Sequence, residues 1–150
     1  MTDRRLAIAA WESLFRAQHE VLDEISADFG DDLTQAEYDV MLTVARSDDG
    51  EARLRDVTSN MLISQPSVSR LVDRMVARGL ISKCPDPQDG RGAVVRATEP
   101  GLAAFRRLAV RHGQAIAERM SVLTDDELAQ LEALTRKLRD NASENDGDND

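Results

Sequence analysis

Between residues 53 and 98 the chain gathers hydrogen-bonding and cationic side chains in two short clusters. The first cluster is the run SQPSVSR at residues 64–70, followed by a further arginine one helical turn later. A guanidinium can bridge two acceptors, an amide can donate and accept together, and a hydroxyl suits a base edge or a phosphate. The candidates for contacts to the major groove of DNA are therefore Ser64, Gln65, Ser67, Ser69, Arg70 and Arg74.

The second cluster is the segment CPDPQDGRG at residues 84–92, whose two prolines and two glycines predict a loop. The flanking segments 80–83 and 93–97 favour strands, so we expect a hairpin with a long tip. Within it, Asp89 precedes Arg91 by two residues. A tip arginine can enter a minor groove, and a carboxylate can fix its guanidinium by a charge-assisted hydrogen bond. The alternative is a solvated turn with an ion pair of little energy.

The elements that hold these clusters are predicted from apolar spacing and capping signals. Thr34 followed by Glu37 forms a capping-box pattern, and Ser64 before Pro66 is typical of an N-cap with a first-turn proline. Gly79 supplies a helix stop. The expected elements are helix 3–29, helix 34–46, a short strand at 53–54, helix 56–62, helix 66–78, strands 80–83 and 93–97, helix 99–120 and a helix from residue 124.

This order predicts a mainly α (α+β) fold, a winged helix-turn-helix with long N- and C-terminal dimerisation helices. We expect a single domain over residues 1–140. In it, residues 34–98 form the winged-helix core, and residues 1–29 and 99–140 form the dimerisation helices. Residues 141–150 are acidic and carry no large apolar side chain, so we expect a disordered tail there.

The net charge of −9 at first argues against a polyanionic partner. The charge is unevenly spread, however: residues 51–98 hold eight basic and five acidic side chains, whereas residues 1–50 hold four and twelve. Charges act mainly within about a Debye length, ~8 Å at physiological salt, so the middle segment can face DNA. No aromatic residue lies between Tyr38 and Phe105, so this segment offers no platform for stacking single strands.

The run from Leu54 to Gly101, with its SQPSVSRLVDRM segment, its wing and its Thr98–Gly101 helix entry, resembles the MarR family of bacterial regulators. The long helices at both ends fit the same family, so the resemblance covers nearly the whole chain. It implies a homodimer that acts at a palindromic operator, expected as a repressor relieved by a small aromatic or anionic effector. It also implies that Arg91 enters the minor groove with Asp89 as its partner, and that the major-groove residues are Gln65, Ser67, Ser69 and Arg70.

The last helix carries a leucine stripe, and both end helices are longer than a winged helix requires. We therefore expect a homodimer that buries these stripes. The alternative is that the helices cover one another within a monomer. For the function, the alternative is an acidic winged-helix protein-interaction module that has lost DNA binding. Steep salt dependence of duplex binding distinguishes the two functions.

Trp11, Phe15 and His19 recur every four residues on the first helix and are the candidates for an effector pocket, although this spacing is also typical of a core face. The two histidines, His19 and His112, and the single cysteine, Cys84, show no metal-ligand spacing, so no metal and no cofactor is expected. We expect Cys84 to be half-buried and inert rather than a redox sensor.

The sequence contains no P-loop, GxSxG or HExxH motif, so we do not expect an enzyme. No apolar stretch approaches the ~18 residues of a membrane span. A single cysteine and an N-terminus without a signal-peptide pattern favour the cytoplasm.

Overall fold

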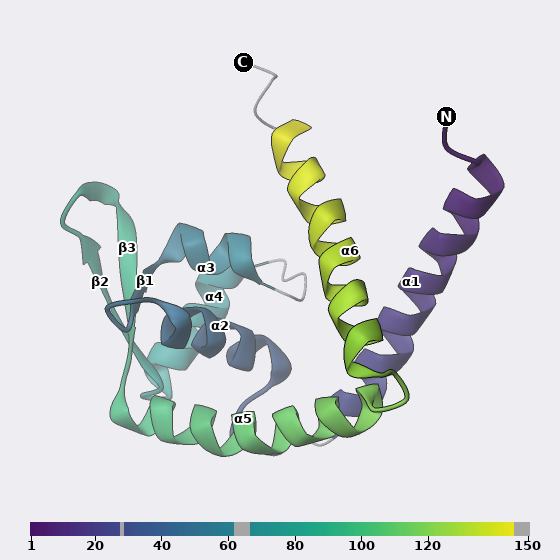
Figure 1. Cartoon of the computed structure of the whole chain (residues 1–150). Helices are drawn as coiled ribbons and strands as arrows, with labels where there is room; N and C mark the ends of the chain where they lie inside the picture. Colours follow the sequence, from purple (N-terminus) through teal and green to yellow (C-terminus); the bar gives the residue numbers. More distant parts are fainter. Residues whose placement is uncertain (28, 62–66, 146–150) are drawn as a thin grey trace. The chain divides into compact units, whose positions relative to one another are not determined.

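The computed structural model describes residues 1–27, 29–61 and 67–145 (Figure 1). Contacts divide the chain into two compact units, Met1–Gln114 and Ala115–Asp150. The predicted winged helix-turn-helix is confirmed in the first unit. The elements are α1 (Arg4–Ser26), α2 (Gln35–Arg46), β1 (Glu51–Arg53), α3 (Leu54–Asn60), α4 (Val68–Ala77), β2 (Ile81–Asp86), β3 (Asp89–Ala97), α5 (Glu99–Met120) and α6 (Asp125–Asn145).

The core of the first unit lies among α2, α3, α4, the start of α5 and a small antiparallel sheet. The strand order is β1-β3-β2, so the last strand lies between the other two. In Figure 1 the β2–β3 hairpin projects beyond the helices. Fully buried side chains fix the helices on the sheet, and the largest of them are Leu33, Met41, Met75, Ile81, Leu108, Val40, Val44, Val57, Val72 and Val95.

Helix α2 begins with the predicted capping box. The Glu37 N–H donates to Thr34 Oγ1 at 3.2 Å, and the Thr34 N–H donates to Glu37 Oε1 at 3.0 Å. Each side chain thus satisfies a backbone donor that the helix start leaves open. The sequence therefore located this helix start correctly.

Helix α4 begins later than expected. Residues 62–66 lie outside the described part of the chain, and they include the expected N-cap Ser64, the candidate Gln65 and the first-turn residue Pro66. In the structure Ser67 is the N-cap, and its hydroxyl accepts a hydrogen bond from the Arg70 N–H at 3.4 Å. Both serines satisfy N-cap chemistry, so residue type alone could not choose between them.

The start of α5 is locked to the end of α4 by the Thr98–Gly101 motif. Thr98 Oγ1 donates to the Gly79 carbonyl at 2.6 Å and accepts from the Gly101 N–H at 3.1 Å. A Cβ on Gly101 would lie 1.9 Å from the Leu80 carbonyl oxygen, so only glycine fits. Gly79 itself has a φ of 75°, a conformation that glycine adopts without strain.

The expectation of a long loop at residues 84–92 is wrong. Strand β2 continues through both Cys84 and Pro85 to Asp86, which pairs with Asp89, so the turn holds only Pro87 and Gln88. A register irregularity at Pro85 and Asp86 accommodates the proline, which has no N–H to donate to a ladder. Proline at the edge of a sheet is compatible with a strand, so the proline and glycine content alone was misleading.

Helix α1 ends at Ser26 rather than at residue 29, and none of its side chains is buried. Helix α6 starts with a second capping box between Thr124 and Glu127. It continues to Asn145, so the expectation of a disordered tail from residue 141 is wrong for 141–145. No proline or glycine occurs between Thr124 and Gly147, and each further helical residue adds one hydrogen bond. Residues 146–150 lie outside the described part.

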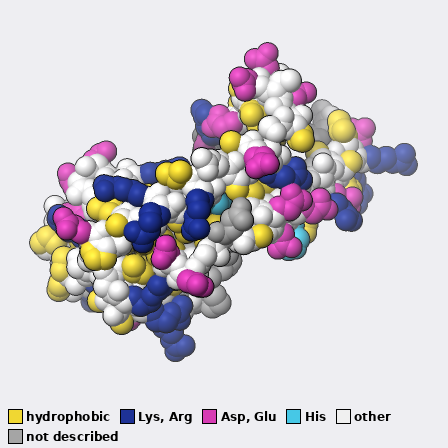
Figure 2. All heavy atoms as spheres, turned by 90° about the horizontal axis from the view of Figure 1, so that it is seen from below, with side chains coloured by type: hydrophobic (Ala, Val, Ile, Leu, Met, Phe, Trp, Pro, Cys, Tyr) yellow, Lys and Arg dark blue, Asp and Glu magenta, His cyan; other side chains and the backbone are white. Residues whose placement is uncertain are grey.

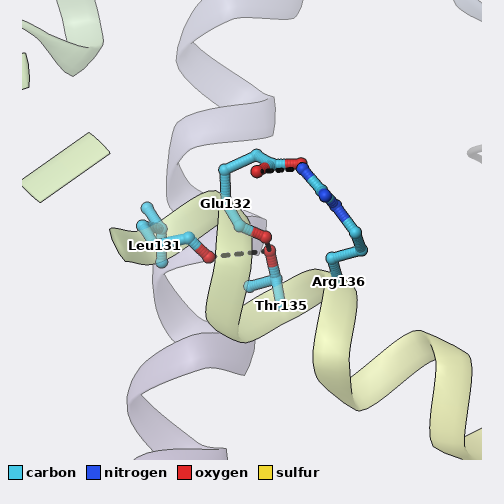
Figure 3. A network of polar contacts seen from close by, with 4 residues as sticks. All are labelled: Leu131, Glu132, Thr135 and Arg136. Atoms are coloured by element: carbon cyan, nitrogen blue, oxygen red, sulfur yellow. Dashed lines mark hydrogen bonds and ion pairs between the residues drawn. The ribbon is translucent and has the colours of Figure 1, made fainter. Parts of the chain in front are cut away.

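The exposed surface of α6 carries local polar contacts (Figure 3). Arg136 folds back one turn onto Glu132, with Nε donating to Oε1 at 2.9 Å, and Thr135 donates to the Leu131 carbonyl at 2.8 Å. The pKa of the Glu132 carboxyl is lowered, first by the Arg136 hydrogen bond. Such i,i+4 pairs support a helix locally and leave its apolar stripe open.

Candidate nucleic-acid interface

The apolar face of α4 faces the core, and its polar face is exposed. Val68, Leu71, Val72 and Met75 are buried, whereas Ser69, Arg70 and Arg74 are exposed and Ser67 is half-buried. Because α-helical residues three or four apart share a face, Arg70 and Arg74 project from neighbouring turns on one side. The second helix of the helix-turn-helix therefore presents its polar side chains outward, as a groove-binding helix must.

On the hairpin, Asp89 and Arg91 are exposed and lie at the start of β3 rather than in a long loop. Asp89 Oδ1 accepts a hydrogen bond from the Arg91 backbone N–H at 3.1 Å. Among the described residues, no ion pair joins the Asp89 carboxylate to the Arg91 guanidinium. Asp89 thus fixes the Arg91 backbone and leaves its guanidinium free to project.

An open groove separates the start of α4 from the hairpin. It brings together four of the predicted site residues, and Arg70 and Arg74 are outside its lining, on the exposed face of α4. The lining comprises Arg53, Leu54, Arg55, Thr58, Ser59, Ser67, Val68, Ser69, Lys83, Cys84, Pro85, Asp86, Asp89, Gly90, Arg91, Gly92 and Ala93.

The contribution of α3 to this groove was not predicted from the sequence. Arg55, Thr58 and Ser59 are exposed on that helix and line the groove. The hydroxyls of Thr58 and Ser59 donate to carbonyls of their own helix, at 3.0 Å and 2.9 Å. Arg55 is the basic residue of α3, so it is the cation that this helix offers to the groove. The excess of basic residues in segment 51–98 was the sequence signal that could have pointed to Arg55.

The basic side chains of residues 51–98 fall into two groups. Four have acidic partners: Arg53 with Asp86, Arg78 with Glu37, Lys83 with Asp73 and Arg96 with Glu51. Within the described part of the chain, the other four have no side-chain hydrogen bond or ion pair. These four are Arg55, Arg70, Arg74 and Arg91.

Positive charge also occurs outside the groove. Figure 2 views the molecule from the side on which α5 lies in Figure 1, and Lys and Arg side chains gather near the end that carries the hairpin. Helix α5 contributes the exposed residues Arg106, Arg107 and Arg111, and Arg107 pairs with Asp32 at 3.5 Å. Basic surface alone therefore does not single out the interface, whereas the groove between a helix and a hairpin does.

The three candidate effector residues share a shallow hollow on α1. Trp11 and Phe15 are 62% and 56% exposed, and their ring centroids lie 5.8 Å apart. Phe15 stacks on His19 at 6.4 Å. All residues that line this hollow belong to α1, so within the described chain it has one wall: Trp11, Glu12, Phe15, Arg16, His19 and Glu20.

A buried aromatic cluster around His112 was not predicted. The His112 ring lies 4.8 Å from that of Phe29 and 5.1 Å from that of Tyr38, and Tyr38 also packs on Phe105. Burial lowers the pKa of His112, against a smaller opposite effect of its hydrogen bond to the Ile25 backbone. Its Nδ1 is buried and has no partner among the described residues. The cluster joins the end of α1, α2 and α5, which are far apart in sequence.

Cys84 is exposed, contrary to the expectation that it is half-buried. Its Sγ lies 3.9 Å from the Val94 carbonyl oxygen on the paired strand. The strand predicted at residues 80–83 stopped three residues short of the end of β2 at Asp86, so the exposed position of Cys84 was not foreseen. None of the described helices has the length and apolarity that a membrane crossing requires.

The helix pair, the groove and the hairpin define a winged helix-turn-helix fold. The sequence model of the MarR family matches residues 31–92. The multiple antibiotic resistance protein MarR of Salmonella typhimurium is 36% identical over 73 residues, which are 48% of this chain and 51% of that protein. The chain thus spans about half the length of this curated relative.

Two solved structures extend the similarity beyond the winged helix. Sco5413 of Streptomyces coelicolor, a MarR family transcriptional regulator, is 28% identical with a TM-score of 0.73, covering 92% of this chain and 96% of that one. BpsR of Bordetella bronchiseptica is 26% identical with a TM-score of 0.75, covering 87% and 98%. The similarity to a MarR family regulator therefore covers most of the chain.

Proposed function

We propose that this protein is a sequence-specific, double-stranded DNA-binding transcriptional regulator, acting as a repressor of a palindromic operator that a small molecule relieves. The observation that supports this most is the groove between α4 and the hairpin, with unpartnered arginines beside it on both elements. A bound duplex would supply the phosphates and base edges that these guanidinium groups lack in the free protein.

Within this proposal each element has a separate role. The exposed side chains of α4 contact the major groove, and Arg91 enters the adjacent minor groove. Asp89 holds the Arg91 backbone, and Arg55 contacts phosphate. The major-groove set is Ser67, Ser69, Arg70 and Arg74, together with Ser64 and Gln65 from the segment outside the described residues.

We propose a homodimer as the active form, in the cytoplasm. Helix α1 exposes Leu6, Ile8, Trp11 and Phe15, and its lack of any buried residue supports a missing partner surface. Helix α6 exposes Leu134 and Leu138 at 63% and 64%. Burying one leucine stabilises by roughly 1.5–3 kcal/mol, so a few such residues suffice for a stable pair. A two-fold dimer places its α4 helices about one turn of DNA apart, roughly 34–36 Å.

The effector is proposed as a small aromatic acid that contacts α1. The relative BpsR is described as having its DNA binding regulated by 6-hydroxynicotinic acid. In this chain Trp11 and Phe15 offer aromatic faces, and Arg16 beside them offers a cation. The one-walled hollow would need a second wall, which a partner subunit can supply.

The test of the function is selection of bound duplexes from a random pool, followed by salt titration of the best sequence. We expect inverted repeats with half-sites one helical turn apart. The logarithm of the binding constant should fall with the logarithm of salt by about 0.9 per phosphate contacted. Failure to enrich any duplex, with salt-indifferent binding to another protein, would instead support the interaction module.

Arg91→Ala tests the hairpin directly. We expect operator affinity to fall at least tenfold, because the only cation at the start of β3 is lost, while the dimer stays folded. Arg96→Ala is the matched control, since Arg96 lies on the same strand but pairs with Glu51. Equal operator affinity of the two variants at moderate salt would exclude a minor-groove role for Arg91. Fluorescence anisotropy and circular dichroism provide the two measurements.

A further inference from the structure

A buried carboxylate lies at the base of the hairpin turn. Asp86 is only 6% exposed, although it is the last residue of an edge strand next to an exposed turn. Burying a carboxylate is unfavourable unless cations and hydrogen-bond donors surround it. Asp86 has both: Arg53 Nε lies 3.2 Å from its Oδ2, and the Gln88 N–H donates to its Oδ1 at 2.9 Å.

The same three residues close a ring. Arg53 Nη2 donates to Gln88 Oε1 at 2.7 Å, so one guanidinium contacts the strand end and the turn together. Arg53 ends β1, and Asp86 ends β2, the two outer strands of the sheet. The Arg53 side chain therefore spans the central strand β3 and ties both edges at the end where the hairpin leaves the sheet.

The ring is connected to the wing arginine by short contacts. Asp86 pairs in register with Asp89 across the turn. Asp89 in turn accepts the Arg91 N–H at 3.1 Å. A Cβ on Gly92 would lie 3.4 Å from the Asp86 Cβ, so the chain beyond Arg91 also packs closely against the buried residue. The position of the Arg91 backbone thus depends on Asp86 from both sides.

We infer that Arg53, Asp86 and Gln88 act as positioning residues that hold the hairpin at a fixed angle and so place Arg91 for DNA. A two-stranded ribbon that projects from a sheet is otherwise free to bend and twist, and each orientation lost on binding weakens affinity. The ring removes that freedom before DNA arrives. This inference rests on the proposed DNA-binding function and adds residues that do not themselves need to touch DNA.

Because Asp86 is negatively charged, the direction in which its replacement changes DNA affinity tests the inference. Removing an acidic charge from a DNA-binding groove strengthens association if only electrostatics matters. A positioning role predicts the opposite. Asp86→Asn keeps the size of the side chain and an oxygen for the Gln88 N–H, but it removes the charge that Arg53 pairs with. We expect operator affinity to fall about tenfold.

The matched control is Glu51→Gln. It removes one acidic charge from the same sheet by breaking the contact between β1 and Arg96 of β3, at the other end of β1 and away from the hairpin. We expect its affinity to change by less than twofold. Affinity that is unchanged or increased in Asp86→Asn would overturn the inference, as would equal losses in the two variants.

A double-mutant cycle identifies the route of the effect. If Asp86 acts through Arg91, the tenfold loss should shrink to less than twofold in an Arg91→Ala background. Full additivity would mean that Asp86 acts elsewhere, and would refute the proposed role. Gln88→Ala provides a second variant if Asp86→Asn does not fold, because Gln88 is exposed and its loss removes only one contact to Arg53. We expect a two- to fivefold loss there, and no loss would count against the ring.

A DNA-free measurement separates this inference from the proposed function. Amide hydrogen exchange should accelerate at residues 84–92 in Asp86→Asn or Gln88→Ala, with exchange in α5 unchanged. If the wild-type protein enriched no duplex, the proposed function would fail while this measurement still tested the ring. Unchanged exchange in the hairpin of both variants would show that the ring does not hold it.

Discussion

Two groups of arginines lie within a few residues of one another in the winged helix, and the fold treats them differently. Arg53, Arg78 and Arg96 each meet an acidic partner on another element. Arg70, Arg74 and Arg91 are exposed and, among the described residues, have no side-chain partner. All are arginines in one basic segment, so residue type does not separate them.

The difference lies in what stands opposite each side chain. Arg78 leaves the last turn of α4 toward Glu37, which is 5% exposed, and toward the Asp32 carbonyl, which accepts from Nη2 at 2.9 Å. It thereby ties α4 to the start of α2. Arg74 and Arg70 lie one and two turns earlier on the same helix, where they are exposed and meet no acidic side chain among the described residues. The partnered arginines thus hold the winged helix in shape, whereas the unpartnered ones remain available for the proposed contacts with DNA.

Among the arginines with acidic partners, we expect Arg78→Ala to lower the free energy of unfolding most. It leaves the buried Glu37 carboxylate without its cation, and breaking a buried pair costs roughly 3–5 kcal/mol. Because the Arg78 side chain is itself 45% exposed, we expect a smaller loss of about 2–3 kcal/mol in the free energy of unfolding. Urea denaturation measures it.

Arg96→Ala is the control for that loss, because its partner Glu51 is much more exposed than Glu37. We expect it to lower stability by less than about 1 kcal/mol. Similar losses in the two variants would break the comparison, since burial of the acidic partner would then not matter.

The sequence predicted the elements well where a local signal determined them. The Thr34–Glu37 and Thr124–Glu127 capping boxes and the Thr98–Gly101 motif depend on residues three apart, and all three are present. The prediction of a long hairpin tip was wrong because strand pairing depends on the partner strand. The two prolines favoured a loop when residues 84–92 were considered alone. For the same reason the sequence could list the basic residues but not say which had partners.

The role of Asp86 could not be predicted at all. Asp86 is distinguished by its burial and by its ion pair with Arg53, which lies 33 residues earlier in the chain. A local pattern contains no signal for such a contact. The aromatic cluster around His112 could not be predicted for the same reason, because it joins the segment between α1 and α2 to residues of α2 and α5.

Arg70→Ala sharpens the comparison on the unpartnered group. We expect it to weaken operator binding by roughly 1–3 kcal/mol and to relax base preference at one operator position, because a guanidinium on the exposed face of α4 can bridge two base acceptors. Binding to a panel of single-base operator variants measures both effects. Stability in urea should stay unchanged, in contrast to Arg78→Ala.

Arg55→Ala is the matched control for base preference. It removes an equally unpartnered arginine, but from α3, where we propose a phosphate contact. It should weaken all operator variants alike and reduce the salt slope by about one. A uniform loss in Arg70→Ala as well would make Arg70 a phosphate contact.

His112 offers the smallest effect and the limiting case, a buried ring whose Nδ1 has no partner among the described residues. Burial lowers its pKa, so between the folded value and the unfolded value near 6.5 only the unfolded chain binds the proton. Stability supplied by the neutral ring is therefore present above about pH 6.5 and falls as the pH drops below it. The slope from one such group cannot exceed about 1.4 kcal/mol per pH unit.

His112→Gln keeps a donor for the Ile25 backbone and removes the titration. We expect urea midpoints at pH 7.5 and 5.5 to differ less in this variant than in the wild-type protein. His19→Gln, on the exposed face of α1, should leave the difference as it is. If His112→Gln also left the difference between the two midpoints unchanged, protonation of the wild-type His112 ring would not destabilise the folded protein. Burial would then make no difference to the energy of a polar group without a partner. The buried His112 ring and the exposed arginines at the groove would behave alike.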